Sequence, residues 1–372
     1  MKALELHAIG DLRLVDIERP APSPEGLLVK TGAALICTSD INDLRRNVFH
    51  LSLPVVMGHE GAGTVVGVGR KVKGFKTGDR VAAHPVHPCG KCANCREGMG
   101  HLCSDMKHFG INMQGTFAEY FVVRQDRARK IGKSVPFEVA ALAEPVSVCL
   151  EALAQARLRQ GDRLLIVGDG PFGVLIARLA GRYYTARRYH TAGRHHAAVR
   201  YHTMGRYHTA VRMGLSKVVV AGHHDFRLSK IGRATGINTH TVSDVAAALM
   251  KETGGRGYDA MILAVGSAKA FETGLDALKA KGRAVVFSAI LDKAPVDLFR
   301  VHVKELEIVG ACNDNDMLDR AVRVLADKRL ALAELVTHRL ALADFEKAFA
   351  LAEAGREEAM KVAFTFEPEG KK

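Results

Sequence analysis

Apolar and polar positions alternate over short stretches in the first 150 residues, and glycine and proline separate these stretches. Residues 26–36 read GLLVKTGAALI and residues 115–123 read GTFAEYFVV, and both patterns are typical of strands. The β-branched stretch Thr64–Val68 lies among glycines and predicts another strand. We therefore expect residues 1–150 to form a β-rich domain.

The pattern changes near residue 151, where short apolar runs begin to alternate with helical segments. A helix is predicted over 151–159 and a short buried strand, DRLLIV, over 162–167. Strands 217–221, 258–265 and 283–288, helices at about 316–328 and 343–354, and a final strand 361–366 complete the predicted elements. Strands that alternate with helices predict an α/β fold with a parallel, doubly wound sheet.

A glycine-rich turn follows the strand predicted at 162–167. Its sequence GDGPFG, residues 168–173, has the spacing G-x-G-x-x-G, and a helix is predicted to open at residue 174. Glycines in this context permit a tight turn and the close approach of a pyrophosphate, and the helix N-terminus supplies N–H groups. The predicted dinucleotide-binding residues are Gly168, Gly170, Pro171, Phe172 and Gly173, with Val265 and Gly266 after a later strand.

Four cysteines lie close together in PCGKCANCREGMGHLC, residues 88–103. Cys89, Cys92, Cys95 and Cys103 have the spacing C-x2-C-x2-C-x7-C. Four thiolates satisfy the tetrahedral preference of Zn²⁺, and a site that uses all four leaves no position for substrate. Free thiols or two disulfides are the alternatives, but cysteines spaced this closely suit disulfide geometry poorly. The motif therefore predicts a structural zinc site.

Length, composition and charge narrow the class of protein. The 372 residues favour two domains, and 48% hydrophobic with 25% charged residues is ordinary for a globular protein. No apolar run approaches the ~20 residues of a membrane span, and charges interrupt the N-terminal segment, which argues against a signal peptide. We therefore expect a cytoplasmic protein with no membrane partner.

The net charge of +13 would suit an acidic partner, but much of it is concentrated in one repeat. Residues 182–211 form five hexapeptides, RYYTAR, RYHTAG, RHHAAV, RYHTMG and RYHTAV, with six arginines and no acid. The repeat could bind nucleic acid through arginine and tyrosine, or a metal through histidine. We favour a surface insertion without a function, because loops tolerate insertions, and do not expect nucleic acid as a partner.

Taken together, these motifs resemble the zinc-dependent medium-chain dehydrogenase/reductase superfamily, and within it the polyol (sorbitol and L-idonate) dehydrogenase branch. Besides the cysteine and glycine motifs, the matching sequences are CTSD at 37–40, GHEGAG at 58–63, EP at 144–145, FRVH at 299–302 and KEL at 304–306. The resemblance implies a GroES-like zinc catalytic domain over 1–150, a Rossmann domain over 151–312 that carries the repeat, and a return to the catalytic domain over 313–372.

The resemblance also implies a catalytic zinc ion. Its expected ligands are Cys37, His59 and Glu144, and Glu60 would bind the metal directly or through water. A zinc with fewer than four protein ligands leaves a position for a substrate oxygen. Ser39 would pass the alcohol proton toward solvent.

The implied reaction transfers a hydride between a secondary alcohol and NAD(P). The expected substrate is a polyol, cyclitol, sugar or sugar acid, and a threonine-type amino-alcohol dehydrogenase is the alternative. Relatives are dimers or tetramers, often paired through the strand that corresponds to Glu307–Gly310, so a homodimer or homotetramer is expected.

Cofactor choice is predicted from the end of the second strand of the dinucleotide fold. Gly222 stands where NAD-preferring relatives carry an acid for the ribose 2′-hydroxyl, and His223, His224 and Arg227 follow it. Absence of the acid removes repulsion of a 2′-phosphate, and cationic groups could hold that phosphate. The sequence therefore favours NADP(H); the alternative is that Asp225 reaches the ribose and NAD(H) is used.

Overall fold

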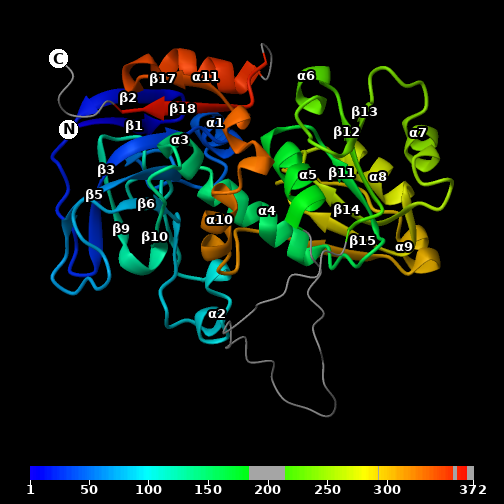
Figure 1. Cartoon of the computed structure of the whole chain (residues 1–372), viewed down its shortest axis with the longest axis horizontal. Helices are drawn as coiled ribbons and strands as arrows, with labels where there is room; N and C mark the ends of the chain where they lie inside the picture. The colour runs from blue at the N-terminus through cyan, green and yellow to red at the C-terminus, as the bar shows by residue number, and fades with distance from the viewer. Residues whose placement is uncertain (184–213, 292, 355–357, 367–372) are drawn as a thin grey trace. The chain divides into compact units, whose positions relative to one another are not determined.

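The computed structural model describes residues 1–183, 214–291, 293–354 and 358–366, and the chain divides into two compact units (Figure 1). The first unit comprises Met1–Cys92, His101–Ser147 and Asn315–Lys372, and the second comprises Ala93–Gly100 and Val148–Asp314. The interpretations of the arginine repeat concern residues that, from 184 onward, lie outside this description.

The first unit is built around a seven-stranded sheet. The strand order is β10-β6-β5-β3-β18-β17, with β9 also paired to β3. The bounds are β3 (Gly26–Leu35), β5 (Glu60–Val68), β6 (Arg80–Ala83), β9 (Tyr120–Arg124), β10 (Ala128–Lys130), β17 (Val336–Leu340) and β18 (Lys361–Thr365). Smaller sheets join β1 (Lys2–Ala8), β2 (Asp11–Asp16) and β4 (Val55–Val56), and β7 (Val86–His87) with β8 (Lys107–His108).

Helices and an aromatic cluster complete this unit. The helices are α1 (Thr38–Arg46), α2 (Ala93–Arg96), α3 (Phe137–Ala140), α4 (Ala143–Gln155), α10 (Leu318–Leu325) and α11 (Phe345–Ala354); α2 and the end of α4 fall within the second unit's ranges. The Phe117 ring packs edge-on against Phe364 of β18, 5.1 Å between centroids, and against Phe349 of α11. Ile36 and Met57 belong to the same buried cluster. Dense packing of this kind fixes the backbone on which the candidate metal ligands lie.

The second unit is a parallel sheet with helices packed on it. The strands are β11 (Arg163–Val167), β12 (Lys217–Gly222), β13 (Thr235–Asn238), β14 (Tyr258–Leu263), β15 (Leu278–Val286) and β16 (Glu307–Gly310). Their spatial order is β13-β12-β11-β14-β15-β16, and every neighbouring pair is parallel. This is the 3-2-1-4-5-6 order of the Rossmann fold. The predicted fold class is confirmed.

The helices of this unit are α5 (Pro171–Tyr183), α6 (Asp225–Leu228), α7 (Val245–Lys251), α8 (Ala268–Asp276) and α9 (Leu298–Lys304). The α5 helix packs on β11 and β12, and α8 packs on β11, β14 and β15 (Figure 1). Among the described residues, none of the helices combines the length and the hydropathy that a membrane span requires.

Several elements differ from their predicted limits: α5 begins at Pro171 rather than at 174, and β15 covers Leu278–Val286 rather than 283–288. The α4 helix begins at Ala143 rather than near 151, because Pro145 lies in its first turn, where the missing N–H costs no helical hydrogen bond. Glu144 is therefore a helical residue. The strand predicted over 115–123 pairs as β9 only from Tyr120, and its first part instead bonds across to residues 56–58.

Candidate zinc and dinucleotide sites

Cys37 and Asp40 are placed together by the junction between β3 and α1. Cys37 is the N-cap residue of α1 and is buried. Its backbone N–H donates to Asp40 Oδ2 at 2.8 Å, which is a common way to satisfy a helix N-terminus. Both side chains are thereby fixed at the first turn of the helix.

His59 reaches the same place from the segment between β4 and β5. Gly58, with φ +91°, precedes it, and a β-carbon at Gly58 would lie 2.4 Å from the Phe117 ring, so only glycine lets the chain pass. His59 Nδ1 lies 3.1 Å from Asp40 Oδ1, and Nε2 lies 3.5 Å from Ser39 Oγ. Burial disfavours the imidazolium, but Asp40 outweighs it and raises the pKa of His59 well above its usual value.

Two buried carboxylates and a lysine complete this cluster. Glu60, the first residue of β5, is paired through Oε1 with Lys361 Nζ of β18. Glu144, in the first turn of α4, is buried, and burial raises its pKa to about 7, with Glu60 adding to the shift. Glu60 Oε2 and Glu144 Oε2 are both buried with no hydrogen-bond partner.

The arrangement fits a bound zinc ion. The ligand atoms of Cys37, His59 and Glu60 lie within 4.8 Å of one another. Glu144 is not one of these three, although its charge interacts with those of His59 and Glu60. Buried carboxylate oxygens without partners are costly, and a cation beside a thiol and an imidazole would satisfy them. Zinc accepts sulfur, nitrogen and oxygen ligands in one site.

The four predicted lobe cysteines also come together. Their Sγ atoms lie within 4.8 Å of one another, and none of the seven cysteines, all described, forms a disulfide. Backbone N–H groups of Lys91 and Cys92 donate to Cys89 Sγ at 3.4 and 3.3 Å and lower the pKa of that thiol. Amides directed at sulfur favour the thiolate, which is the form that binds metal.

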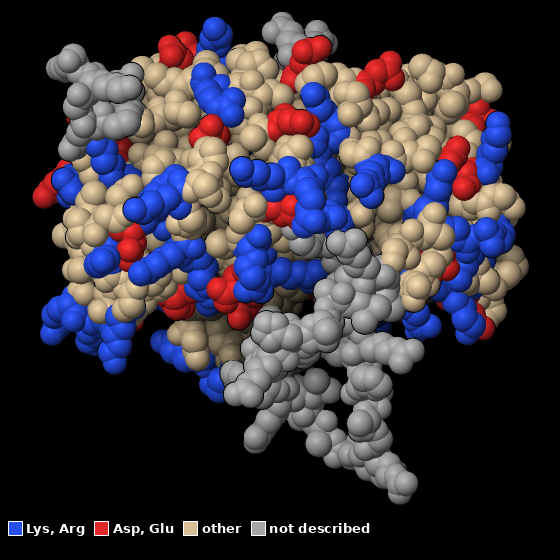
Figure 2. Space-filling model, in the orientation of Figure 1, with Lys and Arg blue, Asp and Glu red and all other residues tan. Residues whose placement is uncertain are grey.

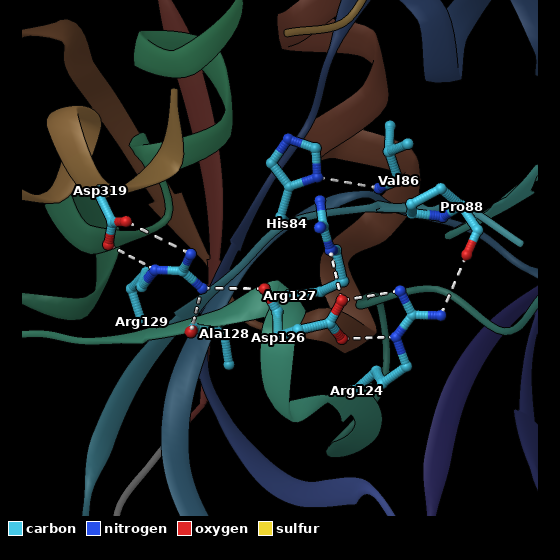
Figure 3. A network of polar contacts seen from close by, with 9 residues as sticks. All are labelled: His84, Val86, Pro88, Arg124, Asp126, Arg127, Ala128, Arg129 and Asp319. Carbon is cyan, nitrogen blue, oxygen red and sulfur yellow. Dashed lines mark hydrogen bonds and ion pairs between the residues drawn. The ribbon is translucent and has the colours of Figure 1, made fainter. Parts of the chain in front are cut away.

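A polar network holds the base of this lobe (Figure 3). Arg124 Nη1 donates to Pro88 O at 3.2 Å, and Arg124 Nη2 donates to Asp126 Oδ2 at 2.8 Å. Arg129 Nη1 donates to Asp126 O at 2.9 Å, and the same guanidinium binds Asp319 of α10. The residue before Cys89 is thus linked through β9 and β10 to a helix of the first unit.

The glycine-rich turn has the geometry that its spacing predicts. Gly168 has φ +117°, and a β-carbon there would lie 2.8 Å from Ala264 O. A β-carbon on Gly173 would lie 2.0 Å from Gly168 O. Helix α5 begins at Pro171, directly after Gly170. These close approaches require glycine and place the start of α5 at the carboxyl end of β11.

The remaining residues predicted to bind the cofactor lie on separate segments of the second unit. Phe172 packs edge-on against Phe287 at 5.4 Å, and a β-carbon on Gly266, after Val265, would lie 2.9 Å from Ala289 O. Gly222 ends β12; His223 and His224 follow it and are exposed, and Arg227 of α6 is half-buried.

Three residues were not predicted from the sequence as parts of a site: Asp40, Lys361 and Asp169. Asp40 and Lys361 contact the candidate ligands His59 and Glu60, and the Asp169 carboxylate lies beside Gly222. Each side chain is polar and at least nine-tenths buried. Such burial indicates a specific partner, and the sequence alone does not show it.

Comparison with known proteins identifies the family. Residues 23–133 match the alcohol dehydrogenase GroES-like domain, and residues 207–327 match the zinc-binding dehydrogenase model. L-threonine 3-dehydrogenase of Pyrococcus abyssi is 31% identical, with 92% of each chain covered. D-altritol 5-dehydrogenase of Agrobacterium fabrum is 30% identical, covering 92% of this chain and 94% of that one. An alcohol dehydrogenase from Thermus sp. ATN1 superposes with a TM-score of 0.81 at 26% identity, covering 99% of this chain and 100% of that chain.

The chain belongs to the zinc-dependent medium-chain dehydrogenase family, as the sequence motifs predicted. It is an oxidoreductase that acts on a secondary alcohol and uses zinc and a nicotinamide cofactor.

Asp40→Ala tests the support that Asp40 gives to His59. We expect about 10- to 100-fold weaker zinc binding at the catalytic site, since a carboxylate behind a ligating histidine contributes about this much. Zinc release to a chromogenic chelator measures it. Asp16→Ala, an exposed acid on β2, is the matched control, and equal release from the two variants would contradict the assignment.

Proposed function

We propose that this enzyme oxidises a secondary hydroxyl of a polyol, sugar or sugar acid and transfers the hydride to NAD(P). The proposal rests on one observation: a buried thiol, imidazole and carboxylate, Cys37, His59 and Glu60, share one point of the first unit, with the unpartnered carboxylate oxygen of Glu144 as a further ligand. A zinc ion held there would supply Lewis acidity that lowers the pKa of the substrate hydroxyl.

Protein side chains would orient this site and move the proton. Asp40 engages Nδ1 of His59 and leaves Nε2 for the metal. Ser39 Oγ, 3.5 Å from His59 Nε2, can accept the substrate proton and pass it toward solvent. Asn42, of the same helix α1, is half-exposed and has no titratable group, so we propose that water completes the path.

The buried charges favour a polyol over threonine. An amino acid substrate needs a cation for its carboxylate, and the buried lysine of the cluster, Lys361, is already paired with Glu60 and lies 3.5 Å from Ile36 O. Lys361 would have to leave this pairing in order to bind a substrate carboxylate. The similarity to D-altritol 5-dehydrogenase supports the same choice, whereas similarity to threonine dehydrogenases favours the alternative.

A panel of polyols, sugar acids and threonine, assayed with NAD and NADP, tests the function. We expect NAD(P)H formation with at least one polyol or sugar acid, its loss after a chelator, and its return with added zinc. Turnover of threonine in preference to every polyol would contradict the substrate class, and turnover that survives complete removal of zinc would contradict the mechanism.

We also propose a second, structural zinc ion, bound by the four lobe cysteines. We further propose that the catalytic residues lie on the first unit and that the dinucleotide binds to the second.

The NADP(H) preference remains a prediction drawn from Gly222. A cytoplasmic location remains a prediction too, supported by seven cysteines that form no disulfide. Figure 2 shows basic side chains with acidic ones among them on the visible face.

The second unit presents an apolar surface that fits a second copy of this chain. Strand β16 is the edge of the six-stranded sheet, and near it Leu298 and Phe299 of α9 are 74% and 76% exposed. Val303 of α9 and Ile308 of β16 are exposed as well. An open strand edge flanked by apolar side chains is an association site unless it is covered, so we propose a homodimer through β16.

Phe299→Glu tests the dimer. A carboxylate at the centre of an apolar interface must be desolvated, so we expect a shift from dimer to monomer in light scattering at micromolar concentration. Ile9→Glu, an equally conspicuous apolar residue of the first unit at 57% exposure, should leave the mass unchanged. A variant at Phe299 with unaltered mass would exclude this surface.

A further inference from the structure

The side chain of Asp169 occupies the space beside the end of β12. Asp169 is the second residue of the glycine-rich turn that follows β11, and β11 and β12 are parallel neighbours, so their carboxyl ends share one edge of the sheet. A β-carbon added to Gly222 would lie 2.3 Å from Asp169 Cβ, 2.5 Å from Cγ and 2.6 Å from Oδ2. No side chain can extend from position 222 while Asp169 lies there.

Hydrogen bonds fix this carboxylate as a buried negative charge. Asp169 Oδ2 accepts the backbone N–H groups of His223 and His224, each at 2.7 Å, and lies 3.1 Å from His224 Nδ1. Asp169 is 5% exposed, and although burial opposes ionisation, the N–H donors hold its pKa below the usual value. The side chain is therefore ionised at neutral pH.

The residues expected to hold a 2′-phosphate already interact with other groups of the protein. His223 Nδ1 lies 2.6 Å from Thr239 Oγ1, and the His223 ring stacks on His240 at 4.3 Å. Arg227 is half-buried, and its charge interacts with that of Asp169. A dianionic phosphate placed here would compete with the Asp169 carboxylate for these groups and would be repelled by it.

The other acid near this edge is also engaged. Asp225 Oδ1 accepts a hydrogen bond from Asn238 Nδ2 at 2.7 Å, and Asp225 is exposed. It therefore points to the end of β13, whereas Asp169 lies against the end of β12.

In dinucleotide-binding folds an acid at the end of the second strand accepts the ribose 2′-hydroxyl of NAD. We propose that Asp169 supplies this carboxylate from the glycine-rich turn, that Gly222 is required to make room for it, and that the enzyme consequently selects NAD(H) over NADP(H). This inference rests on the proposed dehydrogenase function, and it reverses the cofactor preference expected from Gly222 alone.

Equilibrium binding of NADH and NADPH, followed by nucleotide fluorescence without substrate, tests the role of Asp169. Wild-type protein should bind NADH more tightly by about tenfold or more. Asp169→Asn keeps the shape and removes the charge, and we expect the NADH preference to fall by about 10- to 100-fold, the usual effect of a hydrogen bond to a charged group. Asp225→Asn, the neighbouring acid, should leave the preference unchanged.

A relocation of the carboxylate provides the second test. Asp169→Gly should lose the preference for NADH, and adding Gly222→Asp to that variant should restore it, because the space beside β12 is then empty. Gly222→Ala alone should weaken both cofactors, since its β-carbon meets Asp169.

The possible results separate the explanations. Equal weakening of NADH and NADPH in Asp169→Asn, with an unchanged ratio, would mean that Asp169 only supports the turn, and the proposal would be wrong. A wild-type preference for NADPH, or a preference altered by Asp225→Asn instead, would overturn it as well. Binding of neither nucleotide by wild-type protein would reject the dehydrogenase function itself and this inference with it.

Discussion

His59→Gln should reduce kcat/KM by about 10³-fold or more and remove one zinc ion per chain. The reduction follows because Lewis-acid stabilisation by zinc contributes several kcal/mol, and each 1.36 kcal/mol corresponds to about tenfold in rate. His59 is the ligand whose other nitrogen is held by Asp40, and a flexible amide has no second ring nitrogen through which Asp40 could fix its placement. Steady-state kinetics and metal analysis of the purified variant measure the two effects.

His50→Gln is the matched control, since His50 is an exposed histidine of the same unit. It should keep both the activity and the zinc content of the wild-type protein. A His59→Gln enzyme with wild-type turnover, or with full zinc content at both sites, would show that the metal is held elsewhere and would remove the basis of the proposed function.

Cys92→Ser should release the zinc of the lobe and lower Tm by about 5 °C or more. Metal binding at a structural site contributes directly to folding free energy, and about 10–16 kcal/mol is typical of zinc-finger peptides. Here the network of Arg124 and Asp126 also supports the lobe base, so we expect local loosening of residues 88–103 rather than global unfolding. Calorimetry and limited proteolysis measure the two consequences.

Cys312→Ser controls for the loss of a thiol, because Cys312 is exposed and lies outside the lobe. Its Tm and zinc content should match the wild type. If Cys92→Ser retained its zinc and its Tm, the four cysteines would not form a metal site, whatever the outcome at His59.

Motifs whose members are near one another in sequence were the most predictable parts of this protein. The cysteine lobe spans sixteen residues and the glycine turn six, so their spacing alone was enough to predict their geometry. The alternation of apolar runs and helices likewise predicted the parallel sheet. Strand β13 was not predicted, because it has only four residues and includes Gly236, which weakens any strand signal.

Contacts between distant residues were not predictable in this way. Lys361 pairs with Glu60 across 301 positions, and the sequence near Lys361 indicates only an apolar strand. The position of Asp169 was not predictable either, because an acid for the ribose is expected at the end of β12. Asp169 lies in the turn after β11, and only the parallel pairing of β11 with β12 brings it to that place.

The position of β18 has a consequence for how the protein is made. This strand lies inside the seven-stranded sheet, between β3 and β17, although it is the last of the described strands along the chain. Ribosomes add about 5–20 residues per second, so the 301 positions between Glu60 and Lys361 correspond to about 15–60 s of elongation. Throughout that interval residues 33–35 of β3 lack their partner strand β18, and Glu60 lacks its ion pair with Lys361. The ion pair that holds Glu60 therefore forms only after β18 has been made, whereas the proposed zinc ligands are all made within the first 144 residues.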